Sequence, residues 1–191
     1  MSTNSVVAYL NEDGSVISSY VHYDGYETGV GMMLLEHYNT DKCARDLAST
    51  LGYASSLSET VAESHADRVH TDEPETFESM EEFELYLMEN SHLEFGYLWT
   101  GGKWMVASWT TTVEGTGPYA EYNSTWNGFS WLVTSFVRSG RKTVDRFRDL
   151  ALEDNREGRN EYDEFADELE VTVDKWHRYG MSEIASEAMA A

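Results

Sequence analysis

The chain has 191 residues, 41% of them hydrophobic and 13% aromatic, which is enough to fold around a core and argues against a disordered acidic tail. Its 35 acidic and 13 basic residues give a net charge of −22, which repels phosphate backbones and argues against direct nucleic-acid binding. The single cysteine excludes an intrachain disulfide, and the lack of a long apolar run or an N-terminal signal predicts a cytoplasmic protein that contacts no membrane.

The N-terminal part predicts a β-hairpin followed by a helix. Residues 6–23 alternate between apolar and polar side chains around an Asp-Gly dipeptide at positions 13–14, which favours the positive φ angles of a tight turn. A helix is expected over residues 28–39. Two glycines, Gly29 and Gly31, lower the helix propensity of its first turn and therefore require a structural reason.

Two more helices are predicted before residue 91, with a polar segment between them. The first covers residues 41–51 and ends at Gly52. Residues 53–74 are polar and weakly periodic, so we expect a long loop there. An amphipathic helix is then expected over residues 75–90. Its acidic residues lie opposite an apolar stripe that consists of Phe77, Met80, Phe83 and Leu87.

A second hairpin and a helical C-terminal part are predicted in the rest of the chain. Residues 92–111 form two aromatic-rich strands around Gly101-Gly102, a strong hairpin signal. Residues 114–128 have the composition of a loop. Residues 129–137 are apolar and rich in β-branched and aromatic side chains, so both helix and strand stay open there. The pattern from Thr143 onward is helical.

These elements predict an α+β protein. Two β-hairpins build a small antiparallel sheet, and the amphipathic helices at 28–51 and 77–90 cover one of its faces. We expect a single domain over residues 1–191. Within it, residues 1–113 form the α+β core and residues 129–191 form a mainly helical section, which packs alongside the core or mediates assembly.

One candidate ligand site lies at the junction after the first hairpin, and it comprises His22, Asp24, Tyr26 and His37. His22 and Asp24 are two residues apart, so they share a face if they lie in a strand, and the carboxylate could orient the imidazole as a general base. The spacings match no zinc or iron signature, so neither a metal nor a cofactor is predicted. The alternative is a structural junction, in which the glycines allow close approach of helix and sheet.

Nothing else in the sequence indicates catalysis. Cys43 lies on the apolar stripe of a short helix, where a buried structural thiol is the usual role. Neither a serine nucleophile elbow nor a phosphate-binding glycine motif occurs. No catalytic residue is therefore assigned, and a non-enzymatic function is favoured.

Acidic residues gather in two segments, which suggests a partner-binding surface. Residues 59–94 contain 12 acidic residues and one basic residue, and residues 161–174 contain seven acidic residues and no basic one. Carboxylates on successive helical turns project at ~5–6 Å intervals, a spacing similar to that of phosphates along a nucleic-acid strand. The predicted surface consists of Asp72, Glu75, Glu78, Glu81, Glu82, Glu89, Glu161, Glu164 and Glu168. The alternatives are ordinary solvated helix faces and adaptation to high salt.

Five of the 13 basic residues lie in one stretch, residues 138–148. This basic segment is expected to pair with acidic residues of the same chain or of a neighbouring subunit, which would neutralise part of the repulsion.

Residues 15–57 carry an aromatic-x-His-aromatic-Asp-Gly-Tyr stretch, a glycine-rich turn and a helix that ends near Glu-His-Tyr. The motif falls on Tyr20, His22, Tyr23, Asp24, Gly25, Tyr26, Gly29, Gly31, Leu34, Leu35, Glu36, His37 and Tyr38. This pattern resembles the N-terminal part of an uncharacterised family of small tailed-bacteriophage proteins, and residues 94–107 resemble the aromatic hairpin of those proteins. The resemblance implies a phage or prophage origin and brings no catalytic residues, and it does not extend beyond Trp109.

Three functional hypotheses follow. The first is a phage-encoded acidic accessory protein, located in the cytoplasm of the infected cell. It binds a host protein with a basic or DNA-binding surface, and nucleic-acid mimicry is its sharpest form. The second is a small-ligand-binding protein or enzyme with a pocket near His22, Asp24 and His37. The third is a virion or assembly component that forms homo-oligomers through its C-terminal helices and the basic segment.

Overall fold

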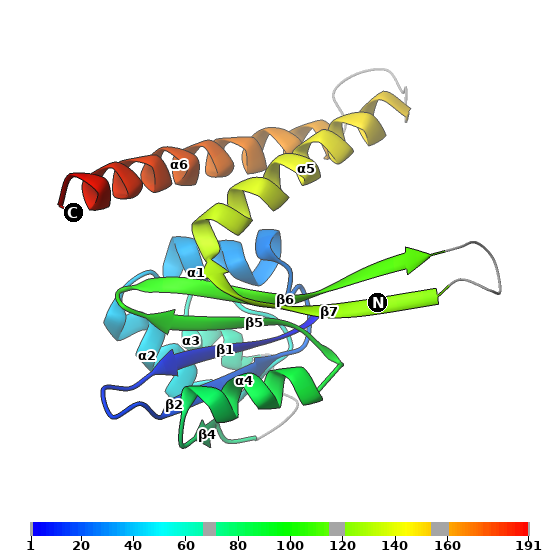
Figure 1. Cartoon of the computed structure of the whole chain (residues 1–191). Coiled ribbons are helices and arrows are strands. Elements are labelled where there is room, and N and C mark those ends of the chain that lie inside the picture. Colours follow the sequence, from blue (N-terminus) through cyan, green and yellow to red (C-terminus); the bar gives the residue numbers. More distant parts are fainter. Residues whose placement is uncertain (1, 67–71, 115–120, 154–160, 191) are drawn as a thin grey trace. The chain divides into compact units, whose positions relative to one another are not determined.

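The computed structural model describes residues 2–66, 72–114, 121–153 and 161–190 (Figure 1). The chain forms two compact units, Met1–Trp131 and Leu132–Ala191. The first unit is a sheet with helices on both faces, and the second is a pair of long helices. Among the described residues, no helix is both long and apolar enough to cross a membrane.

The sheet of the first unit has seven strands. Its order is β3-β2-β1-β5-β6-β7, and the short strand β4 pairs with the same edge of β2 as β3 does. The strands are β1 (Asn4–Leu10), β2 (Val16–Val21), β3 (Tyr53–Ala54), β4 (Glu75–Phe77), β5 (Leu93–Thr100), β6 (Lys103–Glu114) and β7 (Glu121–Trp131).

Both predicted hairpins are confirmed, but the expectation of an antiparallel sheet is wrong. The pairs β1–β2 and β5–β6 are antiparallel, with positive φ angles at Gly14 in the first turn and at Gly101 and Gly102 in the second. The two hairpins join side by side through β1 and β5, which are parallel, and β2 and β3 are parallel too. Parallel neighbours need a long crossover, which the chain between β2 and β5 supplies with its helices.

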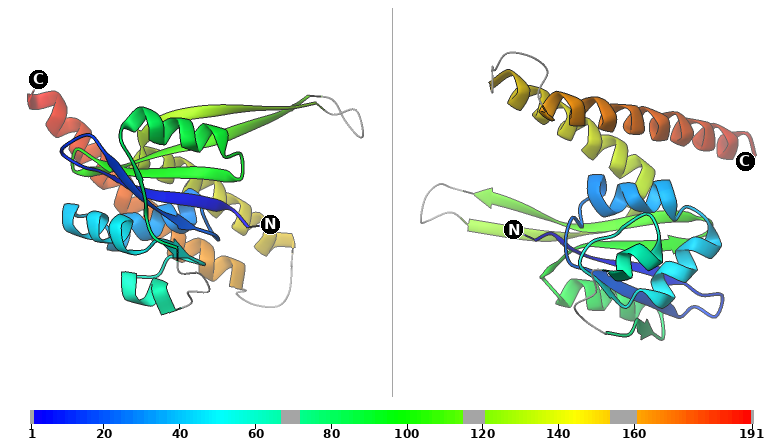
Figure 2. Two further views of the ribbon diagram at one scale, coloured as in Figure 1. Left: turned by 90° about the horizontal axis from the view of Figure 1, so that it is seen from below. Right: turned by 180° about the vertical axis from the view of Figure 1, so that it is seen from behind.

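The helices of the first unit are a π-helical turn η1 (Glu27–Gly31), which leads into α1 (Met32–His37), and then α2 (Asp41–Thr50), α3 (Val61–Ala66) and α4 (Met80–Glu89). Residues 6–8 of β1 are all buried, so both faces of the sheet need a cover. On one face, the Ser19 hydroxyl of β2 donates a hydrogen bond to the carbonyl of Ala48 in α2. On the other face, α4 contributes Phe83 and Leu87 to the core. The predicted helices therefore cover opposite faces and not one face (Figure 2).

The third predicted helix starts later than expected. Residues 75–77 form β4 against β2, and α4 begins only at Met80. Ser79 is its N-cap and accepts a hydrogen bond from the backbone N–H of Glu82, whose carboxylate accepts one from the N–H of Glu78. This reciprocal cap fixes the start of the helix. Phe77 therefore lies on a strand, although its side chain is buried against α4.

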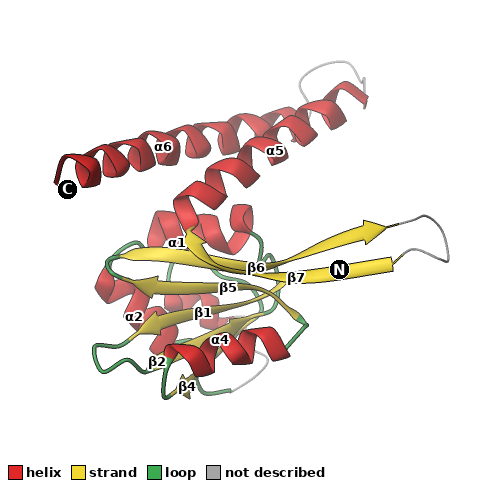
Figure 3. Ribbon diagram, in the orientation of Figure 1, coloured by secondary structure: helices red, strands yellow, loops and turns green. Residues whose placement is uncertain are grey.

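Residues 114–128 are predicted as a loop, but Glu114 and residues 121–128 belong to strands, and residues 115–120 lie outside the described residues. β6 and β7 pair antiparallel, from Glu114 opposite Glu121 to Met105 opposite Trp131. The outer part of this pair extends beyond the other strands (Figure 3). Residues 129–137, for which the sequence leaves helix and strand open, adopt both: β7 continues to Trp131 and a helix begins at Leu132. The outer strands carry polar side chains on both faces, so their sequence lacks the apolar–polar alternation that normally predicts a strand.

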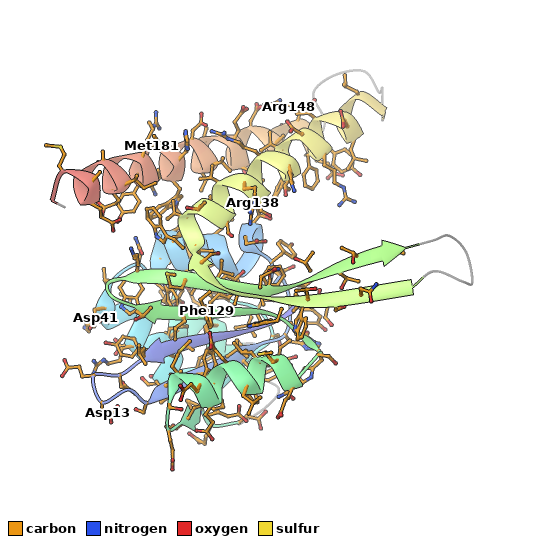
Figure 4. The ribbon with its side chains drawn as sticks, in the orientation of Figure 1. Asp13, Asp41, Phe129, Arg138, Arg148 and Met181 are labelled. Carbon is orange, nitrogen blue, oxygen red and sulfur yellow. The ribbon has the colours of Figure 1, made fainter. Side chains whose placement is uncertain are left out.

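The second unit consists of α5 (Leu132–Glu153) and α6 (Glu161–Ala190). The ring centroids of Phe147 and Phe165 lie 4.6 Å apart, and the helices also bury a set of side chains at helical spacing: Ala166, Leu169, Val173 and Trp176. Arg148 on α5 donates hydrogen bonds to Asp167 (3.0 Å) and Glu170 (2.6 Å) on α6 (Figure 4). Pairing of the basic segment within the chain is therefore confirmed for Arg148.

Candidate functional site

The junction between β2 and α1 is fastened to the sheet by its backbone. Gly25 donates its N–H to the carbonyl of Thr3 (2.8 Å), and its own carbonyl accepts the buried hydroxyl of Tyr97 (2.8 Å). A Cβ on Gly25 would lie 2.6 Å from the Thr3 oxygen, and a Cβ on Gly29 would contact the carbonyl oxygen of Asp24. These two glycines are therefore required by close backbone approach, which is a structural role.

The predicted pairing of His22 with Asp24 is not formed. Asp24 lies beyond the end of β2, has a positive φ of 58° and accepts a hydrogen bond from the hydroxyl of Tyr26 (3.1 Å). The imidazole of His22 instead lies 3.1 Å from the hydroxyl of Tyr20. His37 is exposed in the last turn of α1. Within the described part of the chain, no three His, Cys, Asp or Glu side chains come together as a metal site.

The predicted acidic residues lie on several elements. Glu81, Glu82 and Glu89 lie exposed on α4, and Glu78 precedes it. Asp72 and Glu75 lie outside that helix, so the expected single row over 72–89 is broken by the late start of α4. Glu161, Glu164 and Glu168 are exposed on α6 in the second unit.

The outer face of α4 combines carboxylates with large apolar side chains. Leu85 is 53% exposed and Met88 is 48% exposed, and they lie three residues apart on the helix. Carboxylates occupy the adjacent turns. We call this set the α4 surface; it comprises Glu81, Glu82, Leu85, Met88 and Glu89. The sequence pattern alone does not mark its apolar members, because they fall outside the core stripe and alternate with acidic residues.

A cavity of about 330 Å³ continues from the α4 surface toward the outer part of the β6–β7 hairpin. Met88 lines it together with Phe95 of β5 and Trp109 of β6. The indole of Trp109 lies 5.4 Å from that of Trp126 on β7, and its Nε1 is buried without a hydrogen-bond partner. A buried donor without a partner costs free energy.

Comparisons with known proteins give no assignment: no family model, no curated protein and no solved structure matches the chain. The resemblance to small tailed-bacteriophage proteins therefore stays a prediction.

Proposed function

We propose that this chain is a non-enzymatic binding protein that contacts a basic partner protein through the α4 surface. The observation that carries this proposal is the exposure of Leu85 and Met88 among carboxylates on one face of a helix. Binding energy in protein interfaces concentrates in a few apolar anchors near the centre, with a polar rim around them. The α4 surface has this arrangement, and the cavity beside Met88 offers a place for an anchor from the partner.

Charge defines the class of partner. The net charge of −22 attracts a basic surface over long range and accelerates association at low salt. Glu81, Glu82 and Glu89 supply the local part of this field. The partner is accordingly a protein whose basic surface includes an apolar patch, and the proposed phage origin would make it a protein of the host cell.

Nucleic-acid mimicry is the finer form of this proposal, and it makes a different demand on the surface. A mimic needs carboxylates at phosphate-like spacing, whereas the α4 surface needs its apolar centre as well. The two forms can be separated because Leu85 and Met88 carry no charge.

The test is capture of partners from host lysate, followed by affinity measurements with the captured protein. Leu85→Ala and Met88→Ala are each expected to weaken binding by about tenfold or more, because they remove the anchors. Glu81→Gln with Glu89→Gln is expected to slow association and to reduce its salt dependence. Glu82 is left intact, because its carboxylate caps α4.

The matched control is Glu161→Gln with Glu164→Gln, which makes the same change in net charge on α6. Equal loss of binding in the control and in the α4 variants would indicate bulk charge and overturn the assignment of the α4 surface. Loss of binding with the α4 carboxylates, but not with Leu85→Ala or Met88→Ala, would favour mimicry instead.

We propose assembly with further copies as a second candidate function, which the outer part of the β6–β7 hairpin favours. The side chains of residues 110–113 and 123–125 are exposed on both faces of this two-stranded part. An isolated two-stranded ribbon is marginally stable in water, so a cover from a neighbouring molecule would stabilise it. Light scattering over a range of protein concentrations tests this candidate, and a monomer at every concentration would contradict it.

A further inference from the structure

The outer edge of β2 changes its neighbour halfway along, and a cavity lies at this point. Ser18 pairs with Glu75 of the antiparallel strand β4, whereas Tyr20 pairs with Tyr53 of the parallel strand β3. Both short strands begin at this change of partner. The cavity has a volume of about 290 Å³, which is close to the lower limit of about 300 Å³ for small-ligand pockets.

Three tyrosine rings line the cavity, and they come from three different elements. Tyr20 of β2 and Tyr53 of β3 stack with their centroids 5.4 Å apart, and Tyr86 of α4 contributes the third ring. All three side chains are half-buried. The floor is formed by buried residues, namely Val6 and Ser18. The rings therefore project from ordered elements, two from the sheet and one from α4.

Carboxylates complete the lining. Asp72, Glu73 and Glu75 are exposed and belong to the wall of the same cavity, and no lysine or arginine is among the lining residues that the structure describes. Burial first, and then the charge of Glu75, raise the pKa of Tyr86, so this hydroxyl stays protonated near the carboxylate. Carboxylates alone are typical of a solvated surface, but here they adjoin a pre-formed aromatic cavity.

We propose that this cavity binds a small organic cation that carries an alkylated ammonium group. Aromatic faces attract such a cation through their quadrupoles, and carboxylates at the opening neutralise its charge without requiring N–H donors. A metal ion would need several convergent oxygen or nitrogen ligands, and the described residues bring together no such set. The cavity is also too small for a folded partner, so this site is separate in kind from the α4 surface.

His22 acquires a role in this site. Its Nδ1 lies 3.1 Å from the hydroxyl of Tyr20, and its ring stacks at 6.4 Å on that of Tyr53. It therefore supports two of the three rings from outside the cavity and is a positioning residue.

The test uses choline and its neutral isostere 3,3-dimethylbutan-1-ol, titrated into the full-length protein and followed by proton NMR. Bound choline is expected to show upfield-shifted methyl signals, because its methyl groups would lie over tyrosine rings. The neutral isostere should bind at least about fivefold more weakly, since it lacks the cation–π attraction. Equal binding of the two compounds, or binding of choline without an upfield shift, would overturn the proposal.

Two variants locate the site. Tyr53→Leu removes a ring and Glu75→Gln removes a charge, and each is expected to lower the affinity for choline by about tenfold. Glu183→Gln on α6 makes the same charge change elsewhere and should leave the affinity unchanged. Glu75 is exposed, so Glu75→Gln remains informative if Tyr53→Leu fails to fold. Unchanged affinity in Glu75→Gln, or equal loss in Glu183→Gln, would refute the assignment.

Discussion

Replacement of Gly29 by alanine is expected to destabilise the first unit, because the new Cβ would contact the backbone of Asp24. It would meet the Asp24 carbonyl oxygen and lie 3.0 Å from both the Asp24 Cβ and the ring of Tyr26. Asp24 cannot move freely, since its carbonyl accepts the N–H of Val30 (2.7 Å) and the next residue, Gly25, is bonded on both sides. The clash must therefore be relieved by opening the junction.

The magnitude follows from three effects. Forced overpacking costs about 1–3 kcal/mol. Loss of the hydrogen bond between Val30 and Asp24 adds about 1 kcal/mol. Alanine also lowers the conformational entropy of the unfolded chain, which stabilises the folded state by about 0.4–1 kcal/mol and partly offsets these losses. We therefore expect Gly29→Ala to lower the free energy of unfolding by about 1–4 kcal/mol, a large part of the stability of a typical domain.

Urea unfolding followed by tryptophan fluorescence measures this change. All of the six tryptophans except Trp176 lie in the first unit, so the signal reports mainly on that unit. Gly128→Ala is the control, because a Cβ on Gly128 meets nothing within 4 Å, and it should be neutral or slightly stabilising. Equal urea midpoints for the two variants would show that the contact with Asp24 does not constrain position 29.

Three more perturbations test other parts of the structure. Tyr97→Phe leaves the Gly25 carbonyl without its donor and should cost about 1–2 kcal/mol in urea unfolding. Burial raises the pKa of the Tyr97 hydroxyl well above its usual 10.0, so the unfolded state loses this proton at a lower pH than the folded state does. The free energy of unfolding should therefore fall above pH 10, by up to about 1.4 kcal/mol per pH unit. It should fall less steeply in Tyr97→Phe, which has no proton to lose at this position. Ser79→Ala removes the cap on the N–H of Glu82 and should cost about 1 kcal/mol, seen as a lower thermal midpoint. Arg148→Ala breaks two exposed ion pairs, so we expect only a small shift in the urea midpoint, which high salt should abolish.

Local elements of the fold were predictable from the sequence. The two hairpins carry their own turn dipeptides and alternating strands, and α2 follows Thr40, whose side chain accepts the N–H of Cys43 as an N-cap. The start of α4 lies later than the apolar pattern predicts, because Phe77 lies three residues before Met80 and continues the apolar stripe. The Ser-x-x-Glu pattern at residues 79–82 marks the true start and is visible in the sequence.

Non-local features were not predictable. The parallel pairing of β1 with β5 depends on how two separate hairpins dock, and no residue pattern records it. In the candidate site, the rule that alternate residues share a face fails for His22 and Asp24, because β2 ends at Val21. The rings of the tyrosine cavity come from β2, β3 and α4, which are far apart in the sequence, so no local pattern predicts that they lie together.

The parallel pair at the centre of the sheet also has a consequence for the order of folding. Each hairpin can form early from neighbouring residues, but Val7 meets Tyr97 only after the long intervening segment has been closed into a loop. Contacts between distant parts of a chain slow folding, so docking of the two hairpins should be the slow step. During synthesis, the edge of β1 that pairs with β5 should therefore stay uncovered until β5 has left the ribosome.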